Sequence, residues 1–207
     1  MEKTEFYNSI SPYIPHKSID IVYNIFNKYS LLLVISKPRI SKLGDFKPLN
    51  NKGEYRISVN GDLNKYEFLM TLLHELSHMI IWDEYKRKAK PHGNEWKDMF
   101  GLLIQKMLSF DVFPDDLKDV LSREIKNGRS NFSNMNSNLV RMLENYSSEK
   151  KYIRLEDIPD NLIFTLQSGK IMVKGQKLRK RYKCQEVSSG RLYFVHNLAK
   201  IIEYTEQ

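Results

Sequence analysis

The sequence predicts an α+β fold, in which a core of helices with a small sheet is followed by a small antiparallel β module. Apolar residues recur at helical spacing through most of residues 1–126, and two short strand-like runs interrupt them. After residue 148 the period of the apolar pattern changes from 3.6 to 2. We therefore expect a core over residues 1–126, a linker with a short helix over 127–150, and the β module over 151–207.

The first predicted helix spans residues 18–30, where apolar side chains recur every three or four positions. The run 31–36 (LLLVIS) is short, apolar and partly β-branched, which predicts a buried strand, and Pro38 interrupts it. Residues 54–59 (EYRISV) alternate and predict a second strand after a turn at 50–53.

The next helix is predicted over residues 65–82 and is apolar nearly all round. Asn64 is placed to cap it, with Glu67 three residues on, as in a capping box. His74 and His78 project together, opposite an apolar stripe. A helix of this kind is buried, so the two histidines face something other than bulk water. The stripe consists of Leu69, Leu72, Leu73, Leu76 and Ile80.

The remaining elements are predicted from residues that interrupt helices and strands and from the spacing of apolar residues. A charged connection ends at Pro91, and His92-Gly93-Asn94 opens the following helix. Another helix begins at residues 114–116. The Asn/Ser-rich stretch 127–138 predicts a linker, and a short helix is expected around 138–146. Alternation with Gly/Ser turns predicts strands at 161–167, 170–174, 178–187, 191–196 and 199–204.

Composition limits the class of protein. Apolar residues make up 41% of the 207 residues and aromatic residues 12%, which excludes a disordered chain. No apolar run approaches the roughly 20 residues that span a bilayer, and the first residues lack the apolar segment of a signal peptide. Cys184 is the single cysteine, so an internal disulfide is excluded. We expect a cytoplasmic protein without membrane contact.

The formal net charge of +8 is unevenly distributed. Residues 151–207 carry eleven Lys/Arg against six Asp/Glu, a net of +5, whereas residues 1–150 carry a net of +3. An excess of this kind suggests a polyanionic partner, of which nucleic acid is the usual one. A merely soluble basic surface explains the charge equally well.

The stretch from His74 to His78, HELSH, is an HExxH zinc motif. Two histidines four apart on a helix share one face, so both imidazoles reach one zinc ion. Glu75 is rotated by about 100° and stands beside the metal rather than binding it. His92 is the expected third ligand, with Glu95 as its rival and Asp98 as a remoter one. His16 and His196 are expected to be surface or strand residues.

A site of this kind predicts hydrolysis, because zinc activates a water molecule. Glu75 then accepts the proton of that water and delivers it to the leaving amine. Tyr85 or a lysine of the loop that follows it is a candidate second donor to the developing oxyanion.

The chain resembles the SprT-like metallopeptidases, the SprT and Spartan group. Four segments carry the resemblance: ISKPRISKLGD, YRISVN, LMTLLHELSHMI and HGNEWKDMF. Together they fall within about residues 18–110. The resemblance implies a zincin-like SprT-type core with His74, His78 and His92 as ligands of one Zn²⁺ and Glu75 as the catalytic residue. In the Spartan branch it also implies proteolysis of DNA-bound or DNA-crosslinked proteins.

The chain departs from the family pattern near its end, where many relatives carry a zinc ribbon with paired cysteines. Here Cys184 stands alone, so residues 151–207 resemble a ribbon that has lost its cysteines. This module remains basic. Five of its residues are candidates for nucleic-acid contact, because cations interleaved with an aromatic ring suit phosphates and bases. They are Arg179, Arg181, Lys183, Arg191 and Tyr193. By alternation the first three are expected to share one strand face, which Arg191 and Tyr193 could join from a neighbouring strand. A solvated strand face is the alternative interpretation.

Three functions compete at this point. The first is a zinc endopeptidase that acts on proteins bound to DNA. The second is a nucleic-acid-binding protein in which the metallopeptidase core is only structural, and the intact Glu75 argues against it. The third is a peptidase that acts on peptides or on a dedicated protein partner without DNA.

Overall fold

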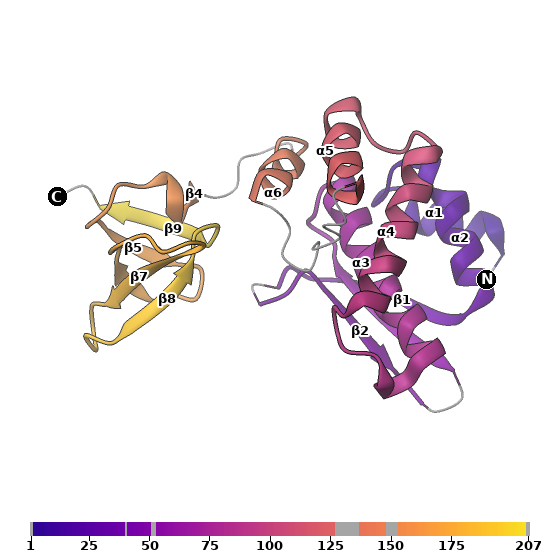
Figure 1. Ribbon diagram of the computed structural model, residues 1–207, viewed down its shortest axis with the longest axis horizontal. Coiled ribbons are helices and arrows are strands. Elements are labelled where there is room, and N and C mark those ends of the chain that lie inside the picture. Colours follow the sequence, from indigo (N-terminus) through magenta and orange to yellow (C-terminus); the bar gives the residue numbers. More distant parts are fainter. Residues whose placement is uncertain (1, 40, 51–52, 127–136, 148–152, 206–207) are drawn as a thin grey trace. The chain divides into compact units, whose positions relative to one another are not determined.

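The computed structural model describes all residues except 1, 40, 51–52, 127–136, 148–152 and 206–207, and it has an α+β fold. The chain divides into two compact units, Met1–Ser147 and Ser148–Gln207. Figure 1 labels their elements. None of the helices in the described part has the length and apolarity that a bilayer crossing requires.

The first unit contains a three-stranded sheet with the order β1-β3-β2. β1 (Ser30–Ser36) pairs in parallel with β3 (Glu54–Asn60), and β2 (Gly44–Pro48) pairs antiparallel with β3. β1 and β3 confirm the two predicted strands. β2 was not predicted as a strand. It forms one edge of the sheet and brings Gly44 next to Glu75.

Six helices are described in the first unit: α1 (Lys3–Ile10), α2 (Ile19–Lys28), α3 (Lys65–Tyr85), α4 (Asn94–Ser109), α5 (Asp115–Lys126) and α6 (Ser137–Glu144). Short 3-10 turns are added at η1 (His16–Ser18) and η2 (Lys86–Lys88). Of the six α-helices, all except α1 correspond to predicted helices. Of the predicted linker, the stretch 127–136 lies outside the described residues, whereas α6 packs within the first unit.

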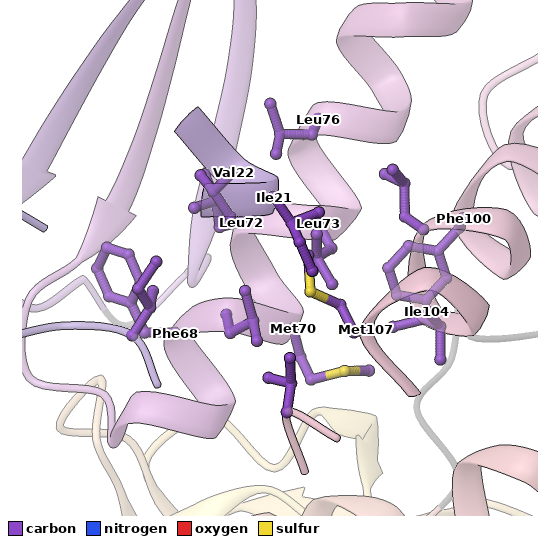
Figure 2. Close-up of a cluster of buried hydrophobic side chains, with 14 of the residues drawn as sticks. Ile21, Val22, Phe68, Met70, Leu72, Leu73, Leu76, Phe100, Ile104 and Met107 are labelled. Carbon is purple, nitrogen blue, oxygen red and sulfur yellow. The ribbon is translucent and has the colours of Figure 1, made fainter. Parts of the chain in front are cut away.

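Helix α3 is the centre of this unit, because it packs against β2 and β3 and also against α4. Its apolar residues therefore find partners nearly all round, as the sequence predicts. Figure 2 shows the resulting core between α2, α3 and α4. It includes Ile21, Val22, Phe68, Met70, Leu72, Leu73, Leu76, Phe100, Ile104 and Met107.

The start of α3 is fixed by the predicted capping box. The Asn64 side chain accepts hydrogen bonds from the backbone N–H groups of Tyr66 and Glu67, at 3.0 Å each. The same side chain donates through Nδ2 to the Leu143 carbonyl at 2.7 Å and to Ser147 Oγ at 3.0 Å. One residue therefore caps α3 and ties the end of α6 to it.

The second unit is an antiparallel six-stranded sheet with the order β4-β9-β5-β6-β7-β8. Its strands are β4 (Ile153–Arg154), β5 (Ile163–Leu166), β6 (Ile171–Val173), β7 (Arg181–Glu186), β8 (Leu192–His196) and β9 (Lys200–Thr205), with η4 (Leu155–Asp157) after β4. The last strand, β9, returns to pair with β5. A small core that includes Phe164, Met172, Tyr182 and Cys184 holds the sheet together.

Buried lysine is rare, and the ammonium group of Lys174 in this unit has three partners. Its Nζ donates to the Ile158 carbonyl at 2.6 Å, pairs with Asp160 at 3.1 Å and lies 4.1 Å from the centre of the Tyr182 ring. Cys184 is buried and free. The second unit therefore has an apolar core, as expected for a module without paired cysteines, and it also buries the Lys174 cation.

Candidate metal centre

Three histidines from two helical segments meet at one point in the first unit. His74 and His78 lie on one face of α3, four residues apart, and His92 lies in the turn before α4. The Nε2 atoms are separated by 3.2 Å for His74–His78, 2.9 Å for His78–His92 and 3.1 Å for His74–His92. Among the described residues this is the only His/Cys/Asp/Glu group arranged to hold a metal ion.

The geometry fits a tetrahedral zinc ion. Two ligands at about 2.0–2.1 Å from such an ion lie about 3.3 Å apart, within a few tenths of an ångström of the observed separations. An Nε2 atom carries either a hydrogen or a lone pair, so three in mutual contact cannot all satisfy one another. A shared cation satisfies all three, and the donor set suits zinc and neighbouring divalent ions.

The three imidazoles are kept neutral by their surroundings. Burial, followed by the neighbouring histidines, lowers the pKa of His74 to about 3. Burial and His92 lower the pKa of His78 to about 4, and burial also lowers the pKa of His92. Neutral imidazole is the form that binds a metal, so the site is ready to bind at neutral pH.

An aromatic side chain supports all three rings. The Trp96 ring lies 4.6 Å from His74, 5.2 Å from His78 and 4.7 Å from His92, measured between ring centres. The Trp96 ring also stacks on Phe100, at 5.1 Å between ring centres. Trp96 is buried and fixes the rings by packing, which limits how far each imidazole can turn.

His92 reaches the centre through an unusual backbone conformation. Its φ is +57°, in the left-handed region that few side chains other than glycine, asparagine, aspartate and histidine adopt. The turn is closed by a hydrogen bond from the Gly93 N–H to the Lys90 carbonyl at 2.9 Å. Glu95, the rival ligand, is exposed and is not part of the group, and neither is Asp98.

Glu75 is buried, with 8% of its surface exposed, and lies on the side of α3 that faces β2. Burial raises the pKa of its carboxyl to about 7, and the charge of Asp45 adds to the increase. The charges of Arg39 and Lys42 and the backbone N–H of Phe46 act in the opposite direction. A carboxyl with a pKa near neutrality can both accept and release a proton.

Gly44 allows β2 to approach Glu75 this closely. A Cβ atom at this position would lie 2.7 Å from Glu75 Oε1 and 2.7 Å from Thr71 Cγ2. Both distances are far shorter than van der Waals contact, so only glycine fits without displacement of the carboxylate.

The connection between β1 and β2 is held in place by a buried amide. Asn60 Oδ1 accepts from Arg39 Nε at 2.8 Å and from Ser36 Oγ at 3.1 Å, while Nδ2 donates to the carbonyls of Arg39 and Lys42 at 3.2 Å each. This network anchors the segment that leads into Gly44. Sequence reasoning missed both Gly44 and Asn60, because their roles depend on the unpredicted strand β2.

If Glu75 has the hydrolytic role expected from the sequence, Gly44→Ala should lower the rate of hydrolysis by about 100-fold without loss of metal binding, because displacement of a catalytic group by about 1 Å has an effect of this size. Gly101→Ala is the matched control, since a Cβ there meets nothing within 4 Å. Metal content and peptidase rate are measured on both. Wild-type rates in the Gly44 variant would show that this contact does not position Glu75.

The remaining predicted residues lie elsewhere. His16 is exposed, and its ring lies edge-on to Tyr7. His196 lies on β8 in the second unit. Tyr85 lies at the end of α3, seven residues beyond His78, and its role as an oxyanion donor stays a prediction.

Of the five candidate nucleic-acid contacts, Arg181 and Lys183 lie on β7 with exposed side chains. Arg179 lies in the bend before β7, since the strand begins at residue 181 rather than 178. Tyr193 pairs with the buried Cys184, so it occupies the opposite face of the sheet from Lys183. Arg191 precedes β8 and lies two residues before Tyr193. Alternation along the strand therefore places both side chains on the same face. The expectation that Arg191 and Tyr193 share the face of Arg181 and Lys183 is therefore wrong.

Comparison with known proteins agrees with the site. No curated protein and no solved structure matches the chain. Residues 34–114 match the family model described as SprT-like family, which is associated with metallopeptidase-type activity. The matched segment contains Gly44, Glu75 and all three histidines. Residues 34–114 are therefore similar to the SprT-like family.

Proposed function

We propose that this chain is a zinc-dependent peptidase with His74, His78 and His92 as the ligands of one zinc ion and Glu75 as the proton-transfer residue. The observation that carries the proposal is the convergence of three neutral Nε2 atoms within 3.2 Å of one another, on the helix that also carries the buried Glu75. When bound, zinc lowers the pKa of a water molecule toward about 7 and polarises the substrate carbonyl.

Glu75 provides the proton movements that hydrolysis requires. One carboxylate oxygen accepts the proton of the attacking water, and the resulting carboxylic acid donates that proton to the nitrogen of the leaving amine. Both steps are feasible near neutral pH because the pKa of Glu75 is raised to about 7. Gly44 leaves room for this carboxylate beside β2, and Asn60 anchors the segment that leads into Gly44.

The edge of β2 offers a place for a peptide. The Leu49 N–H donates to the Glu54 carbonyl and the Asn60 N–H to the Leu43 carbonyl, so odd-numbered residues of this segment bond to β3. The backbone groups of Gly44 and the carbonyl of Phe46 therefore point away from β3, while the Phe46 N–H bonds to Glu75. We propose that a substrate in extended form adds to this edge through main-chain hydrogen bonds.

Metal removal tests the proposal. We expect the purified chain to contain about one zinc per molecule, to cleave casein, to lose cleavage after chelation, and to regain it when zinc is restored. A chain that retains full casein cleavage after complete chelation would refute the proposal. Stoichiometric zinc with no cleavage of any protein would favour the alternative, a nucleic-acid-binding protein with a structural metal centre.

Proteins bound or crosslinked to DNA are the substrates we favour within this proposal, because the chain is basic and its residues 34–114 match the SprT-like family. A peptidase for free peptides or for a dedicated partner is the competing substrate class. Cleavage of a DNA-bound protein that is faster than cleavage of the same protein without DNA would separate the two.

A further inference from the structure

The second unit presents one sheet face that combines exposed apolar groups with cations. On this face, the register of β7 and β8 places Arg181 opposite His196, Lys183 opposite Phe194, and Gln185 opposite Leu192. Tyr182 and Cys184, between these positions, point into the core. We call the face of Arg181, Lys183, Leu192, Phe194 and His196 the β7–β8 outer face.

Two large apolar side chains of this face are in solvent. Phe194 is 57% exposed and Leu192 is 56% exposed. A phenyl ring with this exposure contributes little to the packing of its own unit. It lies beside Lys183 on the neighbouring strand, at a spacing of about 4.8 Å between strands.

The charged side chains of this face are cations. Arg181 and Lys183 are exposed, and in the described part of the chain neither takes part in an ion pair. The acidic Glu186 of β7 lies on the opposite face, where it pairs with Lys170. The β7–β8 outer face is therefore basic as well as apolar.

We infer that the β7–β8 outer face binds single-stranded nucleic acid, with a base stacked on Phe194 and phosphates next to Arg181 and Lys183. Sheet-borne aromatic rings flanked by cations suit this ligand, since every base offers a flat face and every nucleotide a negative charge. The net charge of +5 over residues 151–207 favours the same partner. This inference is independent of peptidase activity.

Other occupants fit the face less well. Duplex DNA satisfies the cations but keeps its bases stacked, so Phe194 gains nothing from it. A second copy of the chain would bring the same cations toward one another across a twofold interface. An acidic peptide would pair with the cations but offers no flat partner for the ring.

Tyr193 is not part of this face. Its ring lies under Lys170, with Nζ 4.3 Å from the ring centre, and its hydroxyl accepts from Lys170 Nζ at 3.1 Å. Phe194 therefore takes the stacking role that alternation alone assigned to Tyr193.

The test measures binding of the full chain to a fluorescein-labelled oligothymidylate by fluorescence anisotropy. We expect Phe194→Ala to weaken binding by about ten-fold or more, and Phe194→Trp to retain it. Phe194→Leu, which keeps an apolar side chain but no aromatic face, should weaken binding as well. Phe110→Ala is the matched control, because Phe110 is 56% exposed but lies in the first unit.

A second measurement isolates the charges. The Arg181→Ala/Lys183→Ala variant should reduce the slope of log affinity against log salt concentration by about 1.4, which is about 0.7 for each phosphate contact. The exposed Lys106 on α4 serves as the control, and Lys106→Ala should leave the slope near its wild-type value.

Several results would overturn the inference. One is wild-type affinity in Phe194→Ala, and another is equally tight binding of a duplex with the same number of phosphates. A third is a concentration-dependent dimer that Phe194→Ala abolishes, which would assign the face to self-association. Competition by polyglutamate as effective as that by the oligonucleotide would assign it to an acidic protein.

Discussion

Replacement of Glu75 by glutamine should abolish peptide hydrolysis while zinc stays bound. Glutamine has nearly the same shape and occupies the same space beside Gly44, but it cannot accept a proton. We expect a loss of about 10²–10⁴-fold in kcat, the range that general acid–base catalysis contributes. The measurement pairs a casein cleavage rate with the zinc content of the same preparation.

The control for this variant is Glu95→Gln, a matched change at an exposed glutamate of α4. It should leave the rate unchanged. Full activity in Glu75→Gln would refute the assigned mechanism, whereas loss of zinc in that variant would mean that Glu75 holds the metal centre together.

Loss of His92 should remove most of the bound zinc and all of the activity. The site falls from three protein ligands to two, so affinity should fall by more than the roughly 10–100-fold that loss of an outer partner causes. His92→Asn is the preferred variant, because asparagine tolerates the left-handed backbone at this position and lacks Nε2. Zinc content after dialysis and the rate of casein cleavage are the measurements.

Glu95→Ala separates the two candidate third ligands. With His92 as the ligand, this variant keeps its zinc, and the opposite pattern would transfer the role to Glu95. His74→Ala or His78→Ala should remove all bound zinc, because the described residues contain no second group that could hold a metal.

The site was readable from the sequence because its main helix is locally encoded. Asn64 and Glu67 mark the start of α3, its apolar residues require burial, and the spacing of His74 and His78 places them on one face. The contribution of His92 follows from a short connection between two predicted helices. These signals lie within a few tens of residues, so no knowledge of long-range packing is needed.

β2 and the contacts it makes could not be predicted in this way. The sequence GDFKP has charged residues at alternate positions and a proline, which is weak evidence for a strand. It forms because β3 supplies hydrogen bonds and Phe46 packs near Tyr55 and Trp82. The role of Gly44 depends on that pairing and therefore stayed hidden.

The face of β8 was assigned wrongly for a related reason. Alternation identifies which residues of one strand share a face, but it does not fix how two strands align. The pairing of Lys183 with Phe194, rather than with Tyr193, depends on the length of the turn between β7 and β8. A shift of one residue moves every side chain to the other face.

The packing of Trp96 against His74, His78 and His92 also has a spectroscopic consequence. The chain has two tryptophans, and one of them lies within 5.2 Å of all three imidazoles. Ions such as Co²⁺, which histidine sites accept in place of zinc, quench indole emission at short range. Intrinsic fluorescence should therefore follow the loading of this protein with metal in real time, with no label attached.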